Sequence, residues 1–363
     1  MTLARYLLVC FLKALIAVQA VIALIVLSAA GVENLRRFSD SPAASVLQVT
    51  VLQSPEVLYQ ATPLVLMLAS LVTFLRLART SELVVMRASG VSALRLIAVP
   101  AAAAIALACV MVAAVNPIVA ASIQRGADMQ DALRGRDPSR LSVSRDGLWL
   151  RQADPEGQTV IQAARTNSDG TALTEARFTR FDGAGRLYAR IEAGTARLDP
   201  GGWTLEQALR WERTPDGRFD PTPLADGRLS IPTTLTREQI IESFSPPETV
   251  SFWELGRFIG QMEDAGFSGR RYRLFLQSEL AKPALYFAMV LIGAAFALRP
   301  ARFGQVGVMM LFAVLAGFSL YFLKDFAESL GASGALPLMV AAWTPPVAAI
   351  LLALGLLLHL EDG

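Results

Sequence analysis

The chain has 363 residues, 53% of them hydrophobic, and a formal net charge of +2 at pH 7. Soluble domains average about 45–50% apolar residues even with glycine counted, so this composition argues against a water-soluble fold. A net charge this small gives no indication of a nucleic-acid partner. Two cysteines and one histidine leave no basis for a disulfide framework or a metal cluster.

The apolar residues fall into two blocks, from Leu3 to Val119 and from Leu274 to Leu360, which flank a polar middle. A membrane-spanning helix needs about 20 mainly apolar residues. Six segments meet this requirement: Leu7–Gly31, Val57–Leu75, Leu96–Val115, Leu280–Leu298, Val306–Leu323 and Leu338–Leu358. The sequence therefore predicts six transmembrane helices with one soluble insert after the third.

The short loops set the orientation of these spans, because cytoplasmic loops are enriched in Lys and Arg. The loop between the second and third spans has a single acid, Glu82, and four arginines: Arg76, Arg79, Arg87 and Arg95. The loop between the fourth and fifth spans has Arg299 and Arg302 and no acid. Both loops are predicted to be cytoplasmic, which places both termini inside and the insert outside.

The first of these loops has the pattern of a short helix between Arg79 and Gly90. Ser81 could cap the start of this helix, and Glu82 would then lie in its first turn, where negative charge is favoured. Gly90 suits a C-cap. A short helix with one acid and an apolar face could dock a soluble partner, although an ordinary positively charged loop would have the same composition.

The apolar pattern changes period between about residues 125 and 248. Short, partly alternating runs are separated by turn signals. The runs are Gly147–Gln152, Thr159–Ala164, Leu187–Ile191 and Trp203–Leu209, and the turns are Asp182-Gly183, Asp199-Pro200-Gly201-Gly202 and Asp216-Gly217. This pattern predicts an all-β domain and leaves open whether it is a sandwich, a jelly roll or an open barrel.

A short amphipathic helix is predicted directly after the β domain. Ser251 and Glu254 fit a capping box, and Gly266 is a plausible stop. Apolar residues follow at helical spacing: Phe252, Leu255, Ile259 and Met262. This helix could lie at the membrane interface or pack on the β domain, and the sequence favours neither.

Residues for catalysis or nucleotide hydrolysis are not found. The one histidine, His359, has no nucleophile nearby, and no lysine follows a glycine as a Walker A loop requires. Any work must therefore be driven by a partner or by an ion gradient. Two acids near the spans, Glu279 and Glu328, have Lys282 and Lys324 at helical spacing, which favours structural ion pairs over a proton relay.

Arginines also occur on the outer side, where the charge rule expects few. Arg36 and Arg37 follow the first span, and Arg270, Arg271 and Arg273 precede the fourth. The rule weakens beside long translocated domains, so these arginines could be ordinary solvated charges. They could equally bind an anionic ligand at the outer leaflet, because arginine pairs bidentately with phosphate.

The run from Ser81 to Gly90 closely resembles the coupling-helix motif of the lipopolysaccharide export permeases, the LptF/LptG family. The resemblance extends to Glu33-Asn34-Leu35-Arg36-Arg37-Phe38, Ser251–Ile259, Arg271-Tyr272-Arg273-Leu274 with Pro283, and Ala341-Ala342-Trp343-Thr344-Pro345. The coupling motif is specific, whereas the hydrophobic stretches carry little information.

The resemblance implies a permease subunit of an ABC transporter that extracts lipopolysaccharide from the inner membrane and passes it to a periplasmic bridge. It implies an LptF-like paralogous permease, an LptB-like ATPase dimer and an LptC-like periplasmic protein as partners. It also implies a periplasmic β-jellyroll, no cofactor and no enzymatic activity of the chain itself.

The resemblance further assigns site residues. Those implied at the ATPase contact are Glu82 and the helix around it, with Met86, Arg87 and Gly90, and those implied at the lipid are Arg36 and Arg37. We also expect Arg271, Arg273 and Lys282 to bind the lipid. Two positions depart from the family pattern, because Ala30 and Glu279 stand where the family has basic residues. Lys282 or the cluster at 270–273 could compensate.

We therefore expect three regions: residues 1–122, with three spans and a coupling helix at about 79–90; residues 123–250, a periplasmic jellyroll-like domain; and residues 251–363, with an interfacial helix and three spans. The expected location is the bacterial inner membrane. Two other functions remain open from the sequence. One is a membrane scaffold that binds a periplasmic partner, and the other is a stand-alone ion-coupled transporter, which would need ionisable residues deep in the bundle.

Overall fold

The structure is a computed structural model of the chain that describes most of residues 3–362. Within this range the undescribed residues are 40, 134–141, 145–146, 155–156, 168–170, 184, 215–217, 223–226, 234–245, 265–266 and 299–305. The expected turn at Asp216-Gly217, the expected stop at Gly266, and Arg299 and Arg302 therefore lie outside the described residues. The chain divides into a helical unit (Met1–Arg134, Ser251–Trp253, Arg273–Gly363) and a β unit (Gly135–Val250, Glu254–Tyr272).

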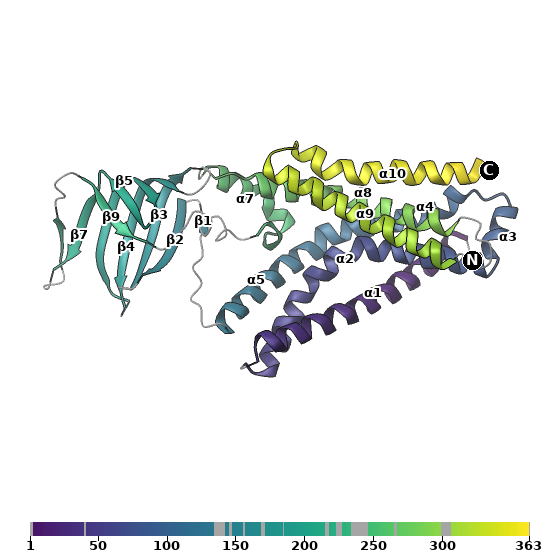
Figure 1. Cartoon of the computed structure of the whole chain (residues 1–363), viewed down its shortest axis with the longest axis horizontal. Helices are drawn as coiled ribbons and strands as arrows, with labels where there is room; N and C mark the ends of the chain where they lie inside the picture. Colours follow the sequence, from purple (N-terminus) through teal and green to yellow (C-terminus); the bar gives the residue numbers. More distant parts are fainter. Residues whose placement is uncertain are drawn as a thin grey trace. The chain divides into compact units, whose positions relative to one another are not determined.

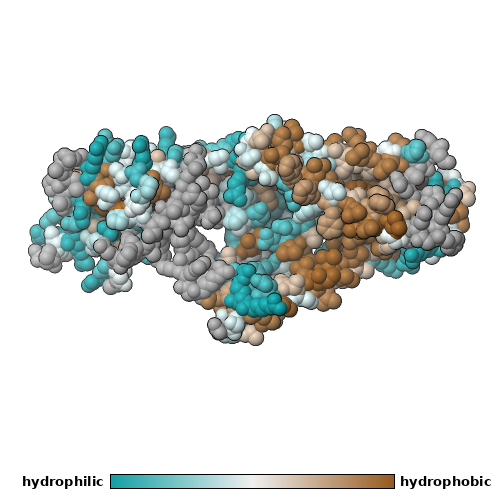
Figure 2. All heavy atoms as spheres, in the orientation of Figure 1, coloured by the Kyte–Doolittle hydropathy of each residue, from teal (hydrophilic) through white to brown (hydrophobic). Residues whose placement is uncertain are grey.

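Among the described residues, six helices are long and apolar enough to cross a membrane, which confirms the predicted number of spans (Figure 1). They are α1 (Leu3–Arg37), α2 (Ala43–Arg79), α4 (Ala93–Val110) continued by η1 (Met111–Val115) and α5 (Asn116–Leu133), α8 (Arg270–Ala297), α9 (Val306–Ser333) and α10 (Leu338–Asp362). Most exceed the roughly 20 residues that cross the hydrocarbon core, because polar residues extend the helices beyond their apolar stretches. Hydrophobic residues cover much of the visible helical surface in Figure 2.

The centre of the helical unit is formed by α2 and α8. In the most apolar stretch of each, 67% of the residues are buried, compared with 6% in α1 and 17% in α9. A glycine permits the close approach, since a Cβ on Gly293 would lie 2.4 Å from the Met67 carbonyl oxygen. The Ser70 hydroxyl donates a 2.8 Å hydrogen bond to the Val290 carbonyl oxygen across the same contact. By comparison, α1 and α9 are peripheral.

A carboxylate is buried between α2 and α8. Glu279 is only 1% exposed, and its Oε1 lies 2.6 Å from Lys282 Nζ, which confirms the predicted pair. The Tyr59 hydroxyl on α2 donates a 2.6 Å hydrogen bond to Glu279 Oε2. Both carboxylate oxygens are thus bonded, as a buried charge requires, and one of the bonds joins two helices.

The second predicted pair, Lys324 with Glu328 on α9, is also confirmed at 2.8 Å. The Ser278 hydroxyl on α8 donates a 2.6 Å hydrogen bond to the other oxygen of Glu328. The two ion pairs therefore do more than neutralise charge locally. Through Tyr59 and Ser278 they connect α8 to α2 on one side and to α9 on the other.

The third span contains a π-helical turn, η1, which contacts the residues that follow the insert. The Trp253 indole N–H donates a 2.9 Å hydrogen bond to the Ala113 carbonyl oxygen inside this turn. Asn116 Oδ1 accepts a 2.8 Å hydrogen bond from the Phe252 backbone N–H. A π turn displaces carbonyl groups from the regular α-helical ladder, which lets Ala113 accept this bond and fixes residues 252–253 to the span.

The amphipathic helix predicted after the β domain is confirmed as α7 (Phe252–Asp264). Its Leu255, Ile259 and Met262 are buried, as their helical spacing predicted. Whether α7 lies at the membrane interface stays a prediction.

Among the described residues, the β unit contains nine antiparallel strands: β1 (Ser142–Ser144), β2 (Gly147–Asp154), β3 (Gly157–Thr166), β4 (Ala172–Asp182), β5 (Leu187–Asp199), β6 (Gly202–Glu206), β7 (Leu209–Arg213), β8 (Phe219–Thr222) and β9 (Leu229–Pro232). The sheet follows the order β1-β2-β3-β4-β5-β6-β9, with β7 on β5 and β8 on β7. The predicted all-β insert is confirmed. The jelly roll stays a prediction. Most of these strands pair with their sequence neighbours, and this pairing alone does not identify a jelly roll.

One predicted strand is wrong. The run Trp203–Leu209 is divided into β6 and β7, which pair with successive parts of β5. Gln207 lies at the break with a left-handed backbone, φ 54°. Such a conformation is uncommon for a residue other than glycine, and apolar alternation gives no signal for it. Alternation itself is confirmed in β5, where Ala189, Ile191 and Ala193 are buried at every second position. In the core of the sheet, Phe178 and Trp203 are buried and meet edge to face at 6.0 Å.

The buried ion pair generates a stability prediction. Glu279→Gln and Lys282→Met each leave one buried charge without its partner and should each cost about 3 kcal/mol, whereas the double variant removes both charges and should cost clearly less than the sum. Thermal unfolding of the purified protein in one detergent measures this. Glu33→Gln is the control, because it breaks an exposed helix pair with Arg37 and should change little. Additive losses in the double variant would contradict the prediction.

Candidate functional site

The predicted cytoplasmic helix exists as α3 (Glu82–Ala88), between α2 and α4. Its predicted N-cap is wrong. Ser81 has a left-handed backbone, φ 58°, and its side chain makes no capping hydrogen bond. An N-cap residue normally has an extended backbone, whereas Ser81 is used in the turn that ends α2, with its N–H bonded to the Ala78 carbonyl oxygen at 3.2 Å.

The predicted glycine C-cap of α3 is confirmed. Gly90 has φ +83°, and its N–H donates a 3.0 Å hydrogen bond to the Arg87 carbonyl oxygen. The next N–H, of Val91, donates to the Met86 carbonyl oxygen at 3.3 Å. These two bonds form a Schellman motif, which ends the helix sharply and fixes its C-terminal turn.

The two faces of α3 differ in burial. Leu83 is buried, and Met86 is half-buried against the helical core. Val84 and Val85 are 65% and 68% exposed, and Arg87 is exposed. Met86 therefore faces inward rather than outward, and the two valines form the exposed apolar face of the helix. The spacing of Leu83 and Met86 on one helical face could have indicated this.

Glu82, the one acid of this loop, is bound from α1. The Tyr6 hydroxyl donates a 2.6 Å hydrogen bond to Glu82 Oε2. Leu7 and Phe11 of α1 are each 1% exposed and belong to the same core as Leu83. The start of α1 is thus bonded to α3 by one charged hydrogen bond, and both elements contribute to one apolar core.

Arg36 and Arg37 lie at the other end of α1, and both side chains are exposed. Arg37 makes a 3.3 Å ion pair with Glu33. The buried Asn34 fixes this end of the helix to α2. Its Nδ2 donates hydrogen bonds of 3.1 Å to Thr50 Oγ1 and 3.0 Å to Gln53 Oε1.

Arg271 and Arg273 lie in the first turn of α8, and both are exposed. Lys282 lies farther along the same helix in a different environment. Its side chain is only 13% exposed, it pairs with Glu279, and its Nζ lies 3.5 Å from the centre of the Tyr59 ring. Its charge is already matched within the protein, so the geometry does not support the predicted lipid contact at Lys282.

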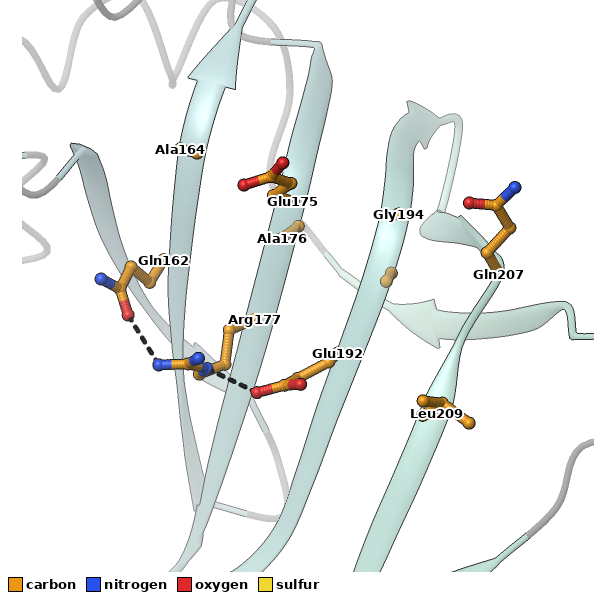
Figure 3. Close-up of a pocket in the computed structure, with 10 residues that line it drawn as sticks. Gln162, Ala164, Glu175, Ala176, Arg177, Glu192, Gly194, Gln207 and Leu209 are labelled. Atoms are coloured by element: carbon orange, nitrogen blue, oxygen red, sulfur yellow. Dashed lines mark hydrogen bonds and ion pairs between the residues drawn. The ribbon is translucent and has the colours of Figure 1, made fainter.

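The β unit has a polar depression on the solvent face of its sheet, drawn in Figure 3. Arg177 bridges Glu192 Oε1, at 2.9 Å, and Gln162 Oε1, at 3.4 Å. The hydrogen bond from Arg190, aided by Arg177, holds the pKa of Glu192 below its usual range. These contacts satisfy the charges within the sheet, and nothing in the depression identifies a ligand.

The depression coincides with a line of backbone irregularities across the sheet. Glu175 and Gln207 both have left-handed backbones, with φ of 53° and 54°. Gly194 lies between them in Figure 3, and a Cβ there would lie 2.3 Å from Gln207 Oε1. The side chain of Gln207 therefore fills the space that the glycine leaves.

Comparison with known families matches residues 5–359 to the family described as "Lipopolysaccharide export system permease LptF/LptG". Two curated relatives are each named "Lipopolysaccharide export system permease protein LptG", from Escherichia coli strain K12 and from Escherichia coli O6:H1 strain CFT073. This chain is 25% identical to each over 312 residues, which cover 85% of this chain and 84% of the relative. The family match includes α3, the β insert and all six apolar helices, and the chain belongs to the LptF/LptG family of lipopolysaccharide export permeases.

Proposed function

We propose that this chain is the LptG-type permease subunit of an ABC transporter that extracts lipopolysaccharide from the bacterial inner membrane and passes it to a periplasmic bridge. The run Glu82-Leu83-Val84-Val85-Met86 favours the LptG branch over the LptF branch. The observation that carries the proposal is α3, a short capped helix with an exposed apolar face in a chain that has no Walker A loop. Because the chain has no nucleotide site of this kind, a separate LptB-like ATPase dimer supplies the energy.

The exposed face of α3 supports the ATPase contact. Two exposed valines, Val84 and Val85, are flanked by Glu82 and Arg87. An apolar centre with charges at its edge is typical of a protein interface. We assign direct contact with the ATPase to these four residues. Met86 packs α3 against the helical core, and Gly90 ends the helix.

The peripheral helices support a second permease subunit. The apolar stretches of α1 and α9 are the least buried of the six, at 6% and 17%. An LptF-like paralogue that packs near these helices would enclose a cavity between two six-helix chains. Membrane lipid would cover the same surfaces in a chain acting alone, so the partner has to be shown by isolation.

The exposed arginines support contact with an anionic lipid. Arg36, Arg37, Arg271 and Arg273 lie at helix ends that this proposal places at the outer leaflet, with both termini in the cytoplasm. Guanidinium groups bind phosphate and carboxylate oxygens bidentately, and lipopolysaccharide carries such groups. The lipid then passes along the periplasmic β unit toward an LptC-like protein.

The buried ionic residues argue against a stand-alone ion-coupled transporter. Glu279 and Glu328 are each bonded through both carboxylate oxygens to a lysine and a hydroxyl. A lysine and a hydroxyl partner give each acid a structural role that accounts for its burial. Neither acid therefore requires a proton-carrying role to explain it, so an external energy source is the better account.

Copurification from native membranes tests the proposal most directly. A transporter subunit should leave the membrane in mild detergent with an ATPase dimer and a paralogous six-span chain in fixed ratio. Mass spectrometry of the isolated complex identifies them. Recovery of this chain with a periplasmic protein alone would instead support a non-transporting scaffold.

Reversal of the charge at the coupling helix should uncouple the complex. In Glu82→Lys, the lysine repels Arg87 and the partner's matching cation, so lipid release per ATP should fall roughly tenfold, the effect of about 1.4 kcal/mol. Release from reconstituted vesicles and phosphate production give the ratio. Glu206→Lys, an exposed reversal in the β unit, is the control. An unchanged ratio in Glu82→Lys would remove α3 from the coupling path.

Removal of the outer arginines should weaken lipid capture. The variant Arg36→Ala/Arg37→Ala deletes two exposed cations and should reduce photo-crosslinking of lipopolysaccharide at the end of α1 several-fold, with a reduced dependence on salt. Glu33→Gln is the matched control, because it removes the ion pair to Arg37 but keeps both arginines. Equal crosslinking in wild type and the alanine variant would exclude this pair from the site.

A further inference from the structure

The helix α1 packs on α2, and its fully buried side chains lie near its two ends. Only three of its described residues are buried: Leu7 and Phe11 near the start, and Asn34 near the finish. The side chains of residues 12–33 are exposed or half-buried throughout. In Figure 1 α1 runs along the lower edge of the helical unit. A helix with so few buried side chains loses little packing when one of its ends moves.

The attachment at the start of α1 is to the coupling helix. Leu7, Phe11 and Leu83 belong to one apolar core, which provides affinity but little direction, because the hydrophobic effect is non-directional. The polar part is the hydrogen bond from the Tyr6 hydroxyl to Glu82 Oε2. Its length of 2.6 Å is that of a strong, charge-assisted bond. This bond fixes the position of Tyr6 relative to the carboxylate.

The carboxylate of Glu82 can bind on two sides at once. Tyr6 occupies Oε2, and within the described residues Oε1 has no hydrogen-bond partner. An ionised carboxylate accepts hydrogen bonds at both oxygens. A cationic side chain of a docked ATPase can therefore bind Oε1 while Tyr6 keeps Oε2.

We propose that Tyr6 is a positioning residue that joins the coupling helix to α1, so that an ATPase bound at Glu82 moves α1 directly. The inference rests on the proposed function and deepens it, by naming the side chain through which force passes from α3 to a spanning helix. Asn34 at the other end, bonded to Thr50 and Gln53, is the pivot. Movement of the start of α1 about this pivot displaces the middle of the helix, whose side chains are exposed or half-buried.

The variant Tyr6→Phe tests the inference, because it removes one hydroxyl and keeps the ring. The experiment uses the complete transporter in vesicles, with a photo-crosslinking residue at the exposed Leu24 in the middle of α1. In wild type, crosslinking of lipopolysaccharide to Leu24 should change with ATP. In Tyr6→Phe, this nucleotide dependence should disappear and lipid release per ATP should fall about fivefold, while ATP hydrolysis and the affinity for the ATPase remain.

The matched variant is Glu82→Gln, whose amide oxygen still accepts from Tyr6 but whose charge is gone. It should weaken ATPase binding, which Tyr6→Phe should not do. The inference is overturned if Tyr6→Phe keeps the nucleotide-dependent crosslink, or if it loses ATPase affinity as Glu82→Gln does, since Tyr6 would then only support docking. If the wild-type complex itself shows no ATP-driven release, the proposed function fails first.

Discussion

The low dielectric of the membrane interior controls this structure, because a charge placed there must be paired and hydrogen-bonded. Glu279 meets the requirement with Lys282 and Tyr59, and Glu328 meets it with Lys324 and Ser278. Each acid takes one partner from its own helix and one from a neighbour. The same bonds that neutralise the buried charges therefore also fix the positions of the helices relative to one another. They connect α8 to α2 and to α9.

The same constraint distinguishes the centre of the helical unit from its periphery. The centre of the unit has a close glycine contact between α2 and α8 as well as the buried ion pairs. The middle of α1 has neither, and the only buried polar residue among the described residues of α1, Asn34, lies near the end of the helix. A transporter that alternately opens and narrows a cavity needs a rigid wall and a movable one. Under the proposed function, α2 and α8 belong to the rigid wall and α1 to the movable one.

Hydropathy predicted the six spans because the membrane demands long apolar helices, and alternation located β2, β3 and β5 because one face of the sheet is buried. Local spacing also predicted the pairs of Glu279 and Glu328. It could not predict that Tyr6 binds Glu82, or that Tyr59 binds Glu279, because the partners are 76 and 220 positions apart. The errors at Ser81 and Gln207 have a different cause. Both residues take left-handed backbones that the surrounding chain imposes and that their own residue types do not indicate.

Under the proposed function, α3 combines two kinds of contact for an ATPase partner. Val84 and Val85 offer apolar area, which gives affinity over a range of orientations. Glu82 offers a carboxylate with a fixed direction, because Tyr6 holds one of its oxygens. Apolar contact alone would let a partner bind without transmitting movement, whereas a single exposed carboxylate would bind weakly. Both kinds of contact lie on one short helix that is capped at Gly90, so in the proposed complex the docked ATPase holds α3 and is connected through Tyr6 to the first membrane span.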